Sequence, residues 1–393
     1  MDDNNVMVNG KTVDKKLFKK VVKKMINERL KITLIGCGAC GNGIVSEIEA
    51  DVQALEGNKS NISFVGINTS TEDLDSVVLS HKIHINGSKG AACERDNGVQ
   101  ELAESIDSIL EELKKYIVED SIIFIVTSLG GGTGSAISPP LAEILLESDY
   151  RVCMVVVLPA DNESLKIKDN ARKTFNEIEV MKPRLGSIFI LDNNTGNKQE
   201  INQTFASLFT GVLCINNKSQ DGNMDLAEIE ACLTTPSFSI ITKANKINGS
   251  TAKIVEILNK SNNIFAKRDD KVVSVIGISE AVSAKDSNID MEELRKEVGT
   301  APTEFHGYLS ESGENVIILS GLTMPYARID SMGESVDKDA DIIQNAVKAT
   351  TEVRTSKESD VFAKASAEAI KKQDNKPKGI SALEKLKEKR ISK

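Results

Sequence analysis

The stretch SIIFIVTSLGGGTGS, residues 121–135, is followed directly by AISPPLAEILLES. Its run of β-branched and aromatic residues predicts a strand buried on both faces, which leads through a glycine-rich turn into a helix. Glycine N–H groups can approach an anion closely, and the positive N-terminal end of the helix adds to the attraction. Thr133 and Ser135 supply hydroxyl donors. Pro139 and Pro140 are expected in the first turns of the helix, where a missing N–H costs little. The stretch therefore predicts a phosphate-binding loop, with an ordinary glycine-rich turn as the alternative.

The composition indicates two packed domains with polar tails. Hydrophobic residues make up 40% of the 393 residues, which is enough for sizeable cores. The net charge of -9 argues against a protein that binds nucleic acid over its whole surface, although it leaves room for local basic segments. The sequence has no run of about 18 apolar residues and no signal-peptide pattern at its charged N-terminus. We therefore expect a cytoplasmic protein without membrane insertion.

The cysteines are scattered through strand-like and glycine-rich stretches, which is typical of reduced thiols in a cytosolic protein. Cys37 and Cys40 have CxxC spacing, but no second CxxC or histidine pair accompanies them. We expect no zinc site and assign no metal-ligating residues.

A second glycine-rich loop, Gly36 to Gly43, follows a predicted strand from Lys31 to Ile35 and precedes a predicted helix. This loop contains GxGxxG, the fingerprint of dinucleotide-binding proteins. A dinucleotide site also needs an acidic residue after the next strand, residues 62–67, and that strand ends in Asn68 instead. An NAD-dependent oxidoreductase is therefore a remote alternative.

Strands alternate with helices along most of the chain, which predicts an α/β fold with a mostly parallel sheet and helices on both faces. Ligands of such sheets bind outside the carboxyl ends of the strands, where the glycine-rich loops are expected. The helix Glu200 to Asn216 is apolar nearly all round and is predicted to be buried between two domains.

Two motifs together resemble the tubulin/FtsZ superfamily. The segment SLGGGTGS, Ser128 to Ser135, looks like the signature loop of that family, and NMDLAE, Asn223 to Glu228, is similar to its NxDxxD/E loop. The loop Gly36 to Gly43 matches the family's first glycine-rich loop in position and length. The resemblance implies a GTPase with a Rossmann-like parallel-sheet domain, a central helix and a smaller α/β C-terminal domain, which assembles head to tail into filaments. The TubZ/PhuZ group of plasmid and phage tubulins is the most similar subgroup, with a cell-division FtsZ-type protein as the alternative.

The resemblance also implies a domain organisation. It consists of an N-terminal extension with an amphipathic helix (1–30, helical from Val13), a GTP-binding domain (31–199), a central helix (200–220), a C-terminal α/β domain (221–330), and a C-terminal helix with a basic tail (331–393). Within the last two segments we expect a turn-rich connection over Leu322 to Asp341 and a long helix over Ala340 to Ile370.

The site residues follow from the same resemblance. The expected cofactor-binding residues are Ala39, Cys40, Gly41, Asn42 and Gly43 at the α and β phosphates, Gly90 and Ala91 near the γ phosphate, Gly132, Thr133 and Gly134 completing the phosphate cage, Asn68 in the same site, Glu163 at the ribose, and Asn202 at the guanine base. Asp225 and Glu228 would be catalytic, because they would orient or activate the water that attacks the GTP held with Mg²⁺ by the next subunit. An alternative is that these two carboxylates only stabilise a helix N-terminus.

One departure from the FtsZ pattern concerns the ribose side of the site. Ile167 stands where FtsZ carries a basic residue, four positions after the ribose-binding glutamate, and Lys166 or Lys168 is the expected substitute.

The tail from Lys371 to Lys393 carries nine positive and three negative side chains. We expect it to bind an adaptor, a DNA–protein complex or a neighbouring subunit through charge, with a solvating tail as the alternative. A non-hydrolysing tubulin-like scaffold is the remaining functional alternative.

Overall fold

The computed structural model describes residues 5–8, 11–14, 30–56, 61–85, 94–213, 215, 222–245, 251–259, 264–299, 302–308 and 314–351. In this part of the chain, ten strands form one sheet in the order β11-β10-β12-β9-β8-β7-β6-β3-β4-β5. Their bounds are β3 Ile32–Cys37, β4 Ile62–Asn68, β5 His81–His84, β6 Ile122–Ser128, β7 Arg151–Leu158, β8 Ser187–Asp192, β9 Ser237–Asn245, β10 Val275–Glu280, β11 Thr303–Tyr308 and β12 Glu314–Leu322. The mostly parallel α/β sheet predicted from the alternation of strands and helices is confirmed.

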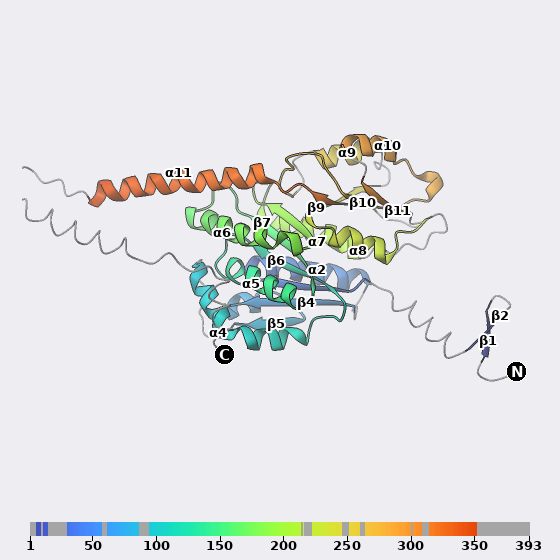
Figure 1. The fold of residues 1–393 in the computed structure, drawn as a ribbon, viewed down its shortest axis with the longest axis horizontal. Helices are drawn as coiled ribbons and strands as arrows, with labels where there is room; N and C mark the ends of the chain where they lie inside the picture. Colours follow the sequence, from blue (N-terminus) through green and yellow to red (C-terminus); the bar gives the residue numbers. More distant parts are fainter. Residues whose placement is uncertain are drawn as a thin grey trace, which may run out of the picture.

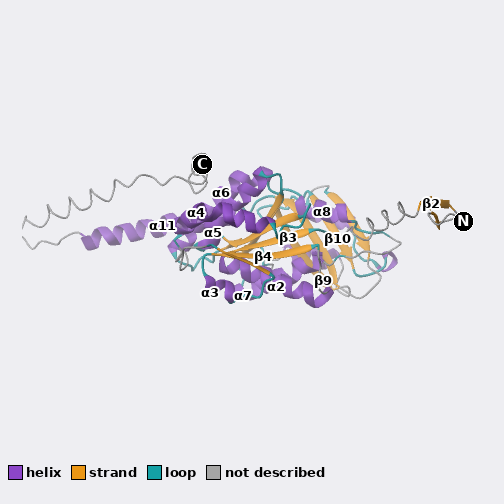
Figure 2. Cartoon of the chain, turned by 90° about the horizontal axis from the view of Figure 1, so that it is seen from below, coloured by secondary structure: helices purple, strands orange, loops and turns teal. Residues whose placement is uncertain are grey.

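Helices cover both faces of this sheet (Figures 1 and 2). Figure 2 shows α2, α3 and α7 on one side of β3 and β4, and α4, α5 and α6 on the other. The bounds are α2 Gly38–Glu56, α3 Thr71–Asp75, α4 Arg95–Lys114, α5 Thr133–Glu147, α6 Leu165–Met181, α7 Lys198–Leu213, α8 Leu226–Thr234, α9 Thr251–Asn259, α10 Met291–Val298 and α11 Tyr326–Thr351, with short 3₁₀ turns at Lys182–Arg184 and Ala284–Asp286. Because both faces are covered, the central strands carry continuous apolar runs, as in residues 122–126 of β6.

The parallel strands end in register at one edge of the sheet. Cys37 at the end of β3 lies opposite Ile67 of β4 on one side and Thr127 of β6 on the other. Leu158 at the end of β7 lies opposite Asp192 of β8. The strand order reverses between β3 and β6, and this switch point is where open α/β sheets bind ligands.

The helix α7 is buried as its sequence predicts. Phe205, Phe209 and Val212 of this helix are each at most 1% exposed. Phe209 packs edge-on against Phe124 of β6 with ring centroids 5.0 Å apart, and Phe205 lies 6.2 Å from Phe265. The sheet continues beyond α7, because Ser187–Phe189 of β8 pair with Ser237–Ser239 of β9.

The N-terminal extension differs from its prediction where the structure describes it. Val13 and Asp14 belong to β2 (Lys11–Asp14), which pairs antiparallel with β1 (Asn5–Val8) and not to a helix. The register brings Val13 opposite Val6, so β-branched side chains pair across the two strands. The remaining part of the predicted amphipathic helix, residues 15–29, lies outside the described residues.

The C-terminal helix begins earlier than predicted. A turn-rich connection was expected over residues 322–341, but α11 starts at Tyr326, directly after Pro325. Ile329, Met332 and Val336 are buried at helical spacing, where α11 packs against α6. The glycine, serine and aspartate residues between them disguise this apolar stripe in the sequence. Beyond it α11 projects from the body of the molecule (Figure 1), and residues 352–393, including the basic tail, lie outside the described residues.

Candidate functional site

Two helix N-termini meet at the switch point between β3 and β6. The helix α2 begins at Gly38, directly after β3, and α5 begins at Thr133, after the glycine-rich turn that follows β6. Gly38 has φ +72°, a conformation that L side chains rarely adopt, and a Cβ added to it would lie 2.8 Å from the backbone N of Gly134. The backbone contact concentrates two positive helix ends in one place, which suits an anion.

The glycine loop after β3 is shorter than its sequence predicts. Residues Ala39 to Gly43 form the first turns of α2, not a loop that precedes it. Only the first four N–H groups of a helix lack an intrahelical partner, so the backbone donors of α2 lie at residues 38–41. Gly41 has no room for a side chain, since its Cβ would lie 2.1 Å from the carbonyl oxygen of Val126. A Cβ on Gly43 would meet nothing within 4 Å.

Asn42 faces the sheet. Its Oδ1 accepts a hydrogen bond from the Ile67 N–H at 3.2 Å, and its Nδ2 donates to the Ile67 carbonyl at 3.3 Å. This fully buried amide joins α2 to β4 and supports the position of the helix N-terminus.

The hydroxyl groups near the turn have different roles. Thr133 Oγ1 lies 2.6 Å from Thr69 Oγ1, so this hydroxyl lies beside the end of β4. Asn68 Oδ1 accepts from the Thr69 N–H at 2.8 Å and orders the same loop. Ser135, in contrast, is fully buried and donates to the carbonyls of Gly131 and Gly132. The prediction that the Ser135 hydroxyl serves as a phosphate donor is therefore wrong, because the loop backbone uses that hydroxyl.

The proline pair lies deeper in α5 than predicted. Because the helix begins at Thr133, Pro139 and Pro140 are interior residues, and Pro139 cannot donate to the Ser135 carbonyl one turn earlier. Arg95 Nε donates to that carbonyl at 3.1 Å, and Thr174 Oγ1 donates to it at 3.4 Å. Neighbouring helices thus supply the hydrogen bond that the proline removes.

Four side chains converge beside the α2 N-terminus. Glu163 Oε2 pairs with Lys198 Nζ at 2.9 Å, and Glu163 Oε1 accepts from the Ala160 N–H at 3.0 Å. Burial opposes ionisation of Glu163, but the contacts with Lys198 and Ala160 outweigh it and lower the pKa of the carboxyl. Burial raises the pKa of the Cys40 thiol to about 11, while Lys198 and a hydrogen bond from Asn202 act in the lowering direction. The structure thus brings the predicted residues Cys40, Glu163 and Asn202 together.

Lys198 is the cation that the sequence-based prediction missed. Lys166 pairs with Glu94 at 2.6 Å and Lys168 pairs with Asp339 at 2.6 Å, so the two predicted substitutes are engaged elsewhere. Lys198 lies four residues before Asn202 on α7, and residues at this spacing share a helix face. The four-residue spacing from Asn202 could have indicated Lys198 from the sequence. It does so only if the predicted helix starts at residue 198 and not at residue 200.

Buried oxygen atoms in this region suit a ligand with N–H or O–H donors. The Oδ1 atoms of Asn202 and Asn193 are buried and have no hydrogen-bond partner among the described residues. Asn202 is the residue expected at the guanine base, and Asn193 Nδ2 donates to Glu163 Oε1 at 3.4 Å. Unpaired buried carbonyl groups are costly, so their presence fits a site that a nucleotide completes. Gly90 and Ala91 lie outside the described residues.

Asp225 and Glu228 form a capping box at the start of α8. Asp225 Oδ1 accepts from the Glu228 N–H at 2.9 Å, and Glu228 Oε2 accepts from the Asp225 N–H at 2.8 Å. The helix-stabilising role that the sequence left open as an alternative is therefore present. Asp225 is nevertheless exposed and Glu228 is half-buried, so the carboxylates remain at the surface.

The helix α8 lies at the opposite edge of the sheet from the glycine turns. Arg151, the first residue of β7, pairs with Glu230 of α8 at 2.7 Å. The Sγ of Cys153 near the same strand start donates to the Leu233 carbonyl at 3.3 Å. The eight residues of β7 span roughly 26 Å at about 3.3 Å per residue. Asp225 and Glu228 are therefore not part of the site at the carboxyl ends within one chain.

Within the described residues, no helix is both long enough and apolar enough to cross a membrane.

Comparison with known proteins identifies relatives of this chain. Residues 31–199 match the family model "Tubulin/FtsZ family, GTPase domain". The tubulin-like protein TubZ of Clostridium botulinum C phage is 27% identical over 317 residues, which cover 79% of this chain and 84% of that protein. The crystal structure of Clostridium botulinum phage c-st TubZ matches with a TM-score of 0.66 at 25% identity, covering 80% of this chain and 99% of that one. A GTPγS-form protofilament of Bacillus thuringiensis serovar israelensis TubZ shares the fold, with a TM-score of 0.67 at 18% identity and coverage of 82% and 94%.

Proposed function

This chain carries a GTPase domain of the tubulin/FtsZ family and resembles TubZ, and we propose that it is a cytoskeletal GTPase that polymerises head to tail into filaments. The family match supports GTP binding and hydrolysis. Filament formation is supported by the protofilament structure of a TubZ relative with the same fold.

One observation carries the proposal that hydrolysis occurs between subunits. The glycine turns lie at the carboxyl ends of the parallel strands, and the exposed Asp225 and the half-buried Glu228 lie at their amino ends. A sheet length separates the two half-sites within one chain, so they meet only when one chain stacks on another. Head-to-tail stacking places the carboxylates of one subunit over the nucleotide of the next.

Each half-site has a separate task in this mechanism. The N–H groups at the starts of α2 and α5 bind the phosphates and stabilise the charge that develops during transfer of the γ phosphate. Mg²⁺ would be held mainly by phosphate oxygens and water, and it would neutralise phosphate charge beside these N–H groups. Glu163 and Lys198 bind the ribose side, and Asn202 accepts from the guanine edge. The carboxylates of Asp225 and Glu228 orient and polarise the attacking water.

The cellular role that we propose is segregation or positioning of plasmid or phage DNA in the cytoplasm. It is supported by the similarity to the TubZ of a phage. In this role the basic tail, residues 371–393, binds an adaptor or a DNA–protein complex through charge. In a pull-down from host lysate, we expect the full chain to capture partners in a salt-sensitive manner and the chain without its tail to lose them. If the tail only solvates the protein, its removal leaves the captured proteins unchanged.

Asp225→Asn tests hydrolysis between subunits. Asparagine caps a helix as well as aspartate does, so α8 is preserved while the carboxylate charge is removed. We expect unchanged GTP binding, longer-lived filaments and a loss of turnover of about 100-fold or more, measured by phosphate release, light scattering and sedimentation. Asp225→Ala is the control for capping, because it also destabilises the chain by about 1 kcal/mol.

Mixing two inactive variants sharpens the test. Asp225→Asn subunits hold GTP but lack the carboxylate, and subunits of a Thr133 variant that no longer binds GTP keep an intact acidic loop. Turnover should return in the mixture, since one of the mixed interfaces is complete. Monomers that hydrolyse GTP below the assembly concentration as fast as filaments do would show that hydrolysis does not require a second subunit. Absence of sedimentable polymer with slowly hydrolysed GTP analogues would refute assembly itself.

A further inference from the structure

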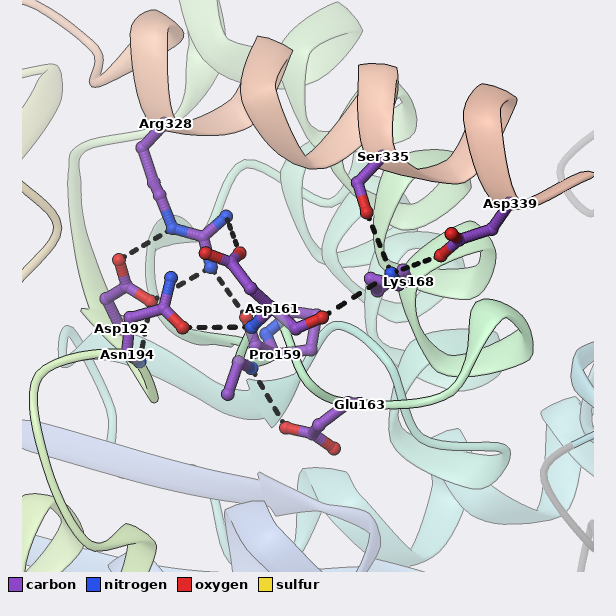
Figure 3. Close-up of polar contacts among 10 residues, drawn as sticks. Pro159, Asp161, Glu163, Lys168, Asp192, Asn194, Arg328, Ser335 and Asp339 are labelled. Carbon is purple, nitrogen blue, oxygen red and sulfur yellow. Dashed lines mark hydrogen bonds and ion pairs between the residues drawn. The ribbon is translucent and has the colours of Figure 1, made fainter.

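The base of α11 is fixed to the sheet edge by a largely buried arginine, Arg328. The Arg328 side chain is 11% exposed, and that of Asp192, the last residue of β8, is 6% exposed. Arg328 Nε donates to Asp192 Oδ2 at 2.8 Å and its Nη2 donates to Oδ1 at 3.1 Å, in a two-pronged arrangement that only a guanidinium provides (Figure 3). Arg328 is thus bound at the carboxyl end of a strand, beside the candidate nucleotide site.

The same guanidinium also holds the segment that carries Glu163. Arg328 Nη2 donates to the Pro159 carbonyl at 2.7 Å, and Nη1 lies 3.3 Å from Asp161 Oδ1. Residues 159–163 connect the end of β7 to the start of α6. In Figure 3 Pro159 and Asp161 lie between Arg328 and Glu163, so α11 contacts one side of the segment that presents Glu163 on the other.

A second set of contacts runs through the residues after β8. Asp192 Oδ1 accepts from the Asn194 N–H at 3.0 Å, and Asn194 Oδ1 accepts from the Asp161 N–H at 2.9 Å. Both ends of this path meet Arg328, because it binds the carboxylates of Asp192 and Asp161. The segment 159–163 is therefore held from two directions by one side chain of α11.

Lys168 extends the contact along α11. Its side chain is 4% exposed and donates to Ser335 Oγ at 2.8 Å and to Asp339 Oδ2 at 2.6 Å. Arg328, Ser335 and Asp339 are seven and four residues apart, so they lie on one face of α11. This face of α11 therefore makes both sets of contacts, through Arg328 and with Lys168, at the carboxyl ends of the strands.

We propose that Arg328 is a positioning residue for the nucleotide site: it fixes the 159–163 segment and thereby the Glu163 carboxylate that binds the ribose. Docking of the α11 base and ribose recognition are then one linked equilibrium, so that whatever pulls α11 from the sheet edge also loosens the nucleotide. The inference rests on the proposed function, in which Glu163 binds the ribose.

The test compares binding of GDP and of 2′,3′-dideoxy-GDP to the full chain, below the concentration at which it assembles. A residue that only anchors α11 changes stability without changing the preference for the ribose hydroxyls. If Arg328 positions Glu163, Arg328→Gln weakens GDP binding about tenfold, the size expected for one hydrogen bond to a charged group. Binding of the dideoxy nucleotide changes little, so the preference is lost. Glu163→Gln should have the same effect, and the double variant should lose no more than either single variant.

Arg172→Gln is the matched control. Arg172 also joins α6 to α11, through Asp337 at 2.6 Å, and its other ion-pair partner is Asp169 of α6 rather than a residue of the segment 159–163. This variant removes a more exposed arginine–aspartate ion pair between α6 and α11 and should leave both affinities unchanged. Arg328→Lys keeps the charge beside Asp192 but lacks the two-pronged geometry, so it should restore part of the preference. If Arg328→Gln does not fold, as judged by circular dichroism, Arg328→Lys and Asp192→Asn give the measurement.

The outcomes distinguish the positioning role of Arg328 from the ribose-binding role of Glu163 on which it rests. If Glu163→Gln abolishes the ribose preference and the Arg328 variants behave like Arg172→Gln, Arg328 is only an anchor and the positioning role is refuted. If Glu163→Gln itself leaves the preference intact, the ribose role of Glu163 is wrong and the positioning role is overturned with it.

Discussion

The two edges of the parallel sheet are built in opposite ways. At the carboxyl edge, backbone meets backbone, as at Gly38 and Gly134, and added methyl groups have no room. At the amino edge, Asp225 and Glu228 are at the surface and contact each other's backbone N–H groups. The first edge is formed by packing within one chain, so it is ready to bind a ligand before any partner arrives. In the mechanism that we propose, the second edge becomes part of a site only when another subunit covers it.

This difference predicts where substitution is tolerated. A preformed edge is sensitive to a single methyl group, because interiors are close-packed and relax only partly. At an exposed edge, substitutions leave folding largely intact but impair the reaction that we propose for that edge.

The largest effect is expected from Gly41→Ala. The added Cβ would lie 2.1 Å from the Val126 carbonyl oxygen, which belongs to the central strand β6 and cannot move aside cheaply. We expect a loss of about 3 kcal/mol in the free energy of unfolding, measured by urea denaturation. Gly43→Ala is the matched control in the same helix, and its open surroundings predict a gain of up to about 1 kcal/mol from helix propensity. Equal effects of the two substitutions would contradict the packing argument.

An intermediate effect is expected from Lys198→Ala. This substitution removes the cation beside Glu163, and GDP binding should weaken about fivefold, as expected for a partly exposed charge. Lys166→Ala removes a lysine that pairs with Glu94 instead and should leave the affinity unchanged. If Lys166→Ala weakens binding and Lys198→Ala does not, the ribose-side cation is Lys166, which lies next to the position where FtsZ carries its basic residue. Fluorescence anisotropy of a labelled GDP measures both variants.

The smallest perturbation of the protein is a change of pH, which tests the reactivity of Cys40 without any substitution. Burial raises the pKa of this thiol to about 11, so the reactive thiolate is scarce at pH 8. Alkylation by iodoacetamide should accelerate about tenfold per pH unit between pH 8 and 10, because the thiolate fraction rises in that proportion below the pKa. Bound GDP should slow it further. Mass spectrometry of the peptide containing Cys40 measures the rate, and a plateau near pH 9 would place the pKa at its ordinary value.

The sequence by itself predicted the elements whose signals are local. The apolar strands, the alternation with helices and the glycine-rich segments at the starts of α2 and α5 follow from residue types at fixed spacing, and the buried face of α7 follows from its periodicity. The two motifs around Thr133 and Asp225 also led to the family, which the comparisons bear out. Each of these features depends on neighbours along the chain.

Only the tertiary structure decided which partners those residues have. Ser135 donates to its own loop, Asn42 binds β4, and the Ser135 carbonyl freed by Pro139 is satisfied by Arg95 from α4. The ion pair of Lys198 with Glu163 joins residues 35 positions apart, and the two hydrogen bonds of Arg328 to Asp192 join residues 136 positions apart. Such contacts depend on how the strands are ordered and how the helices dock, and no local pattern of residue types encodes that order. The chain's periodicity therefore determined its elements, while long-range packing determined which side chains form the site.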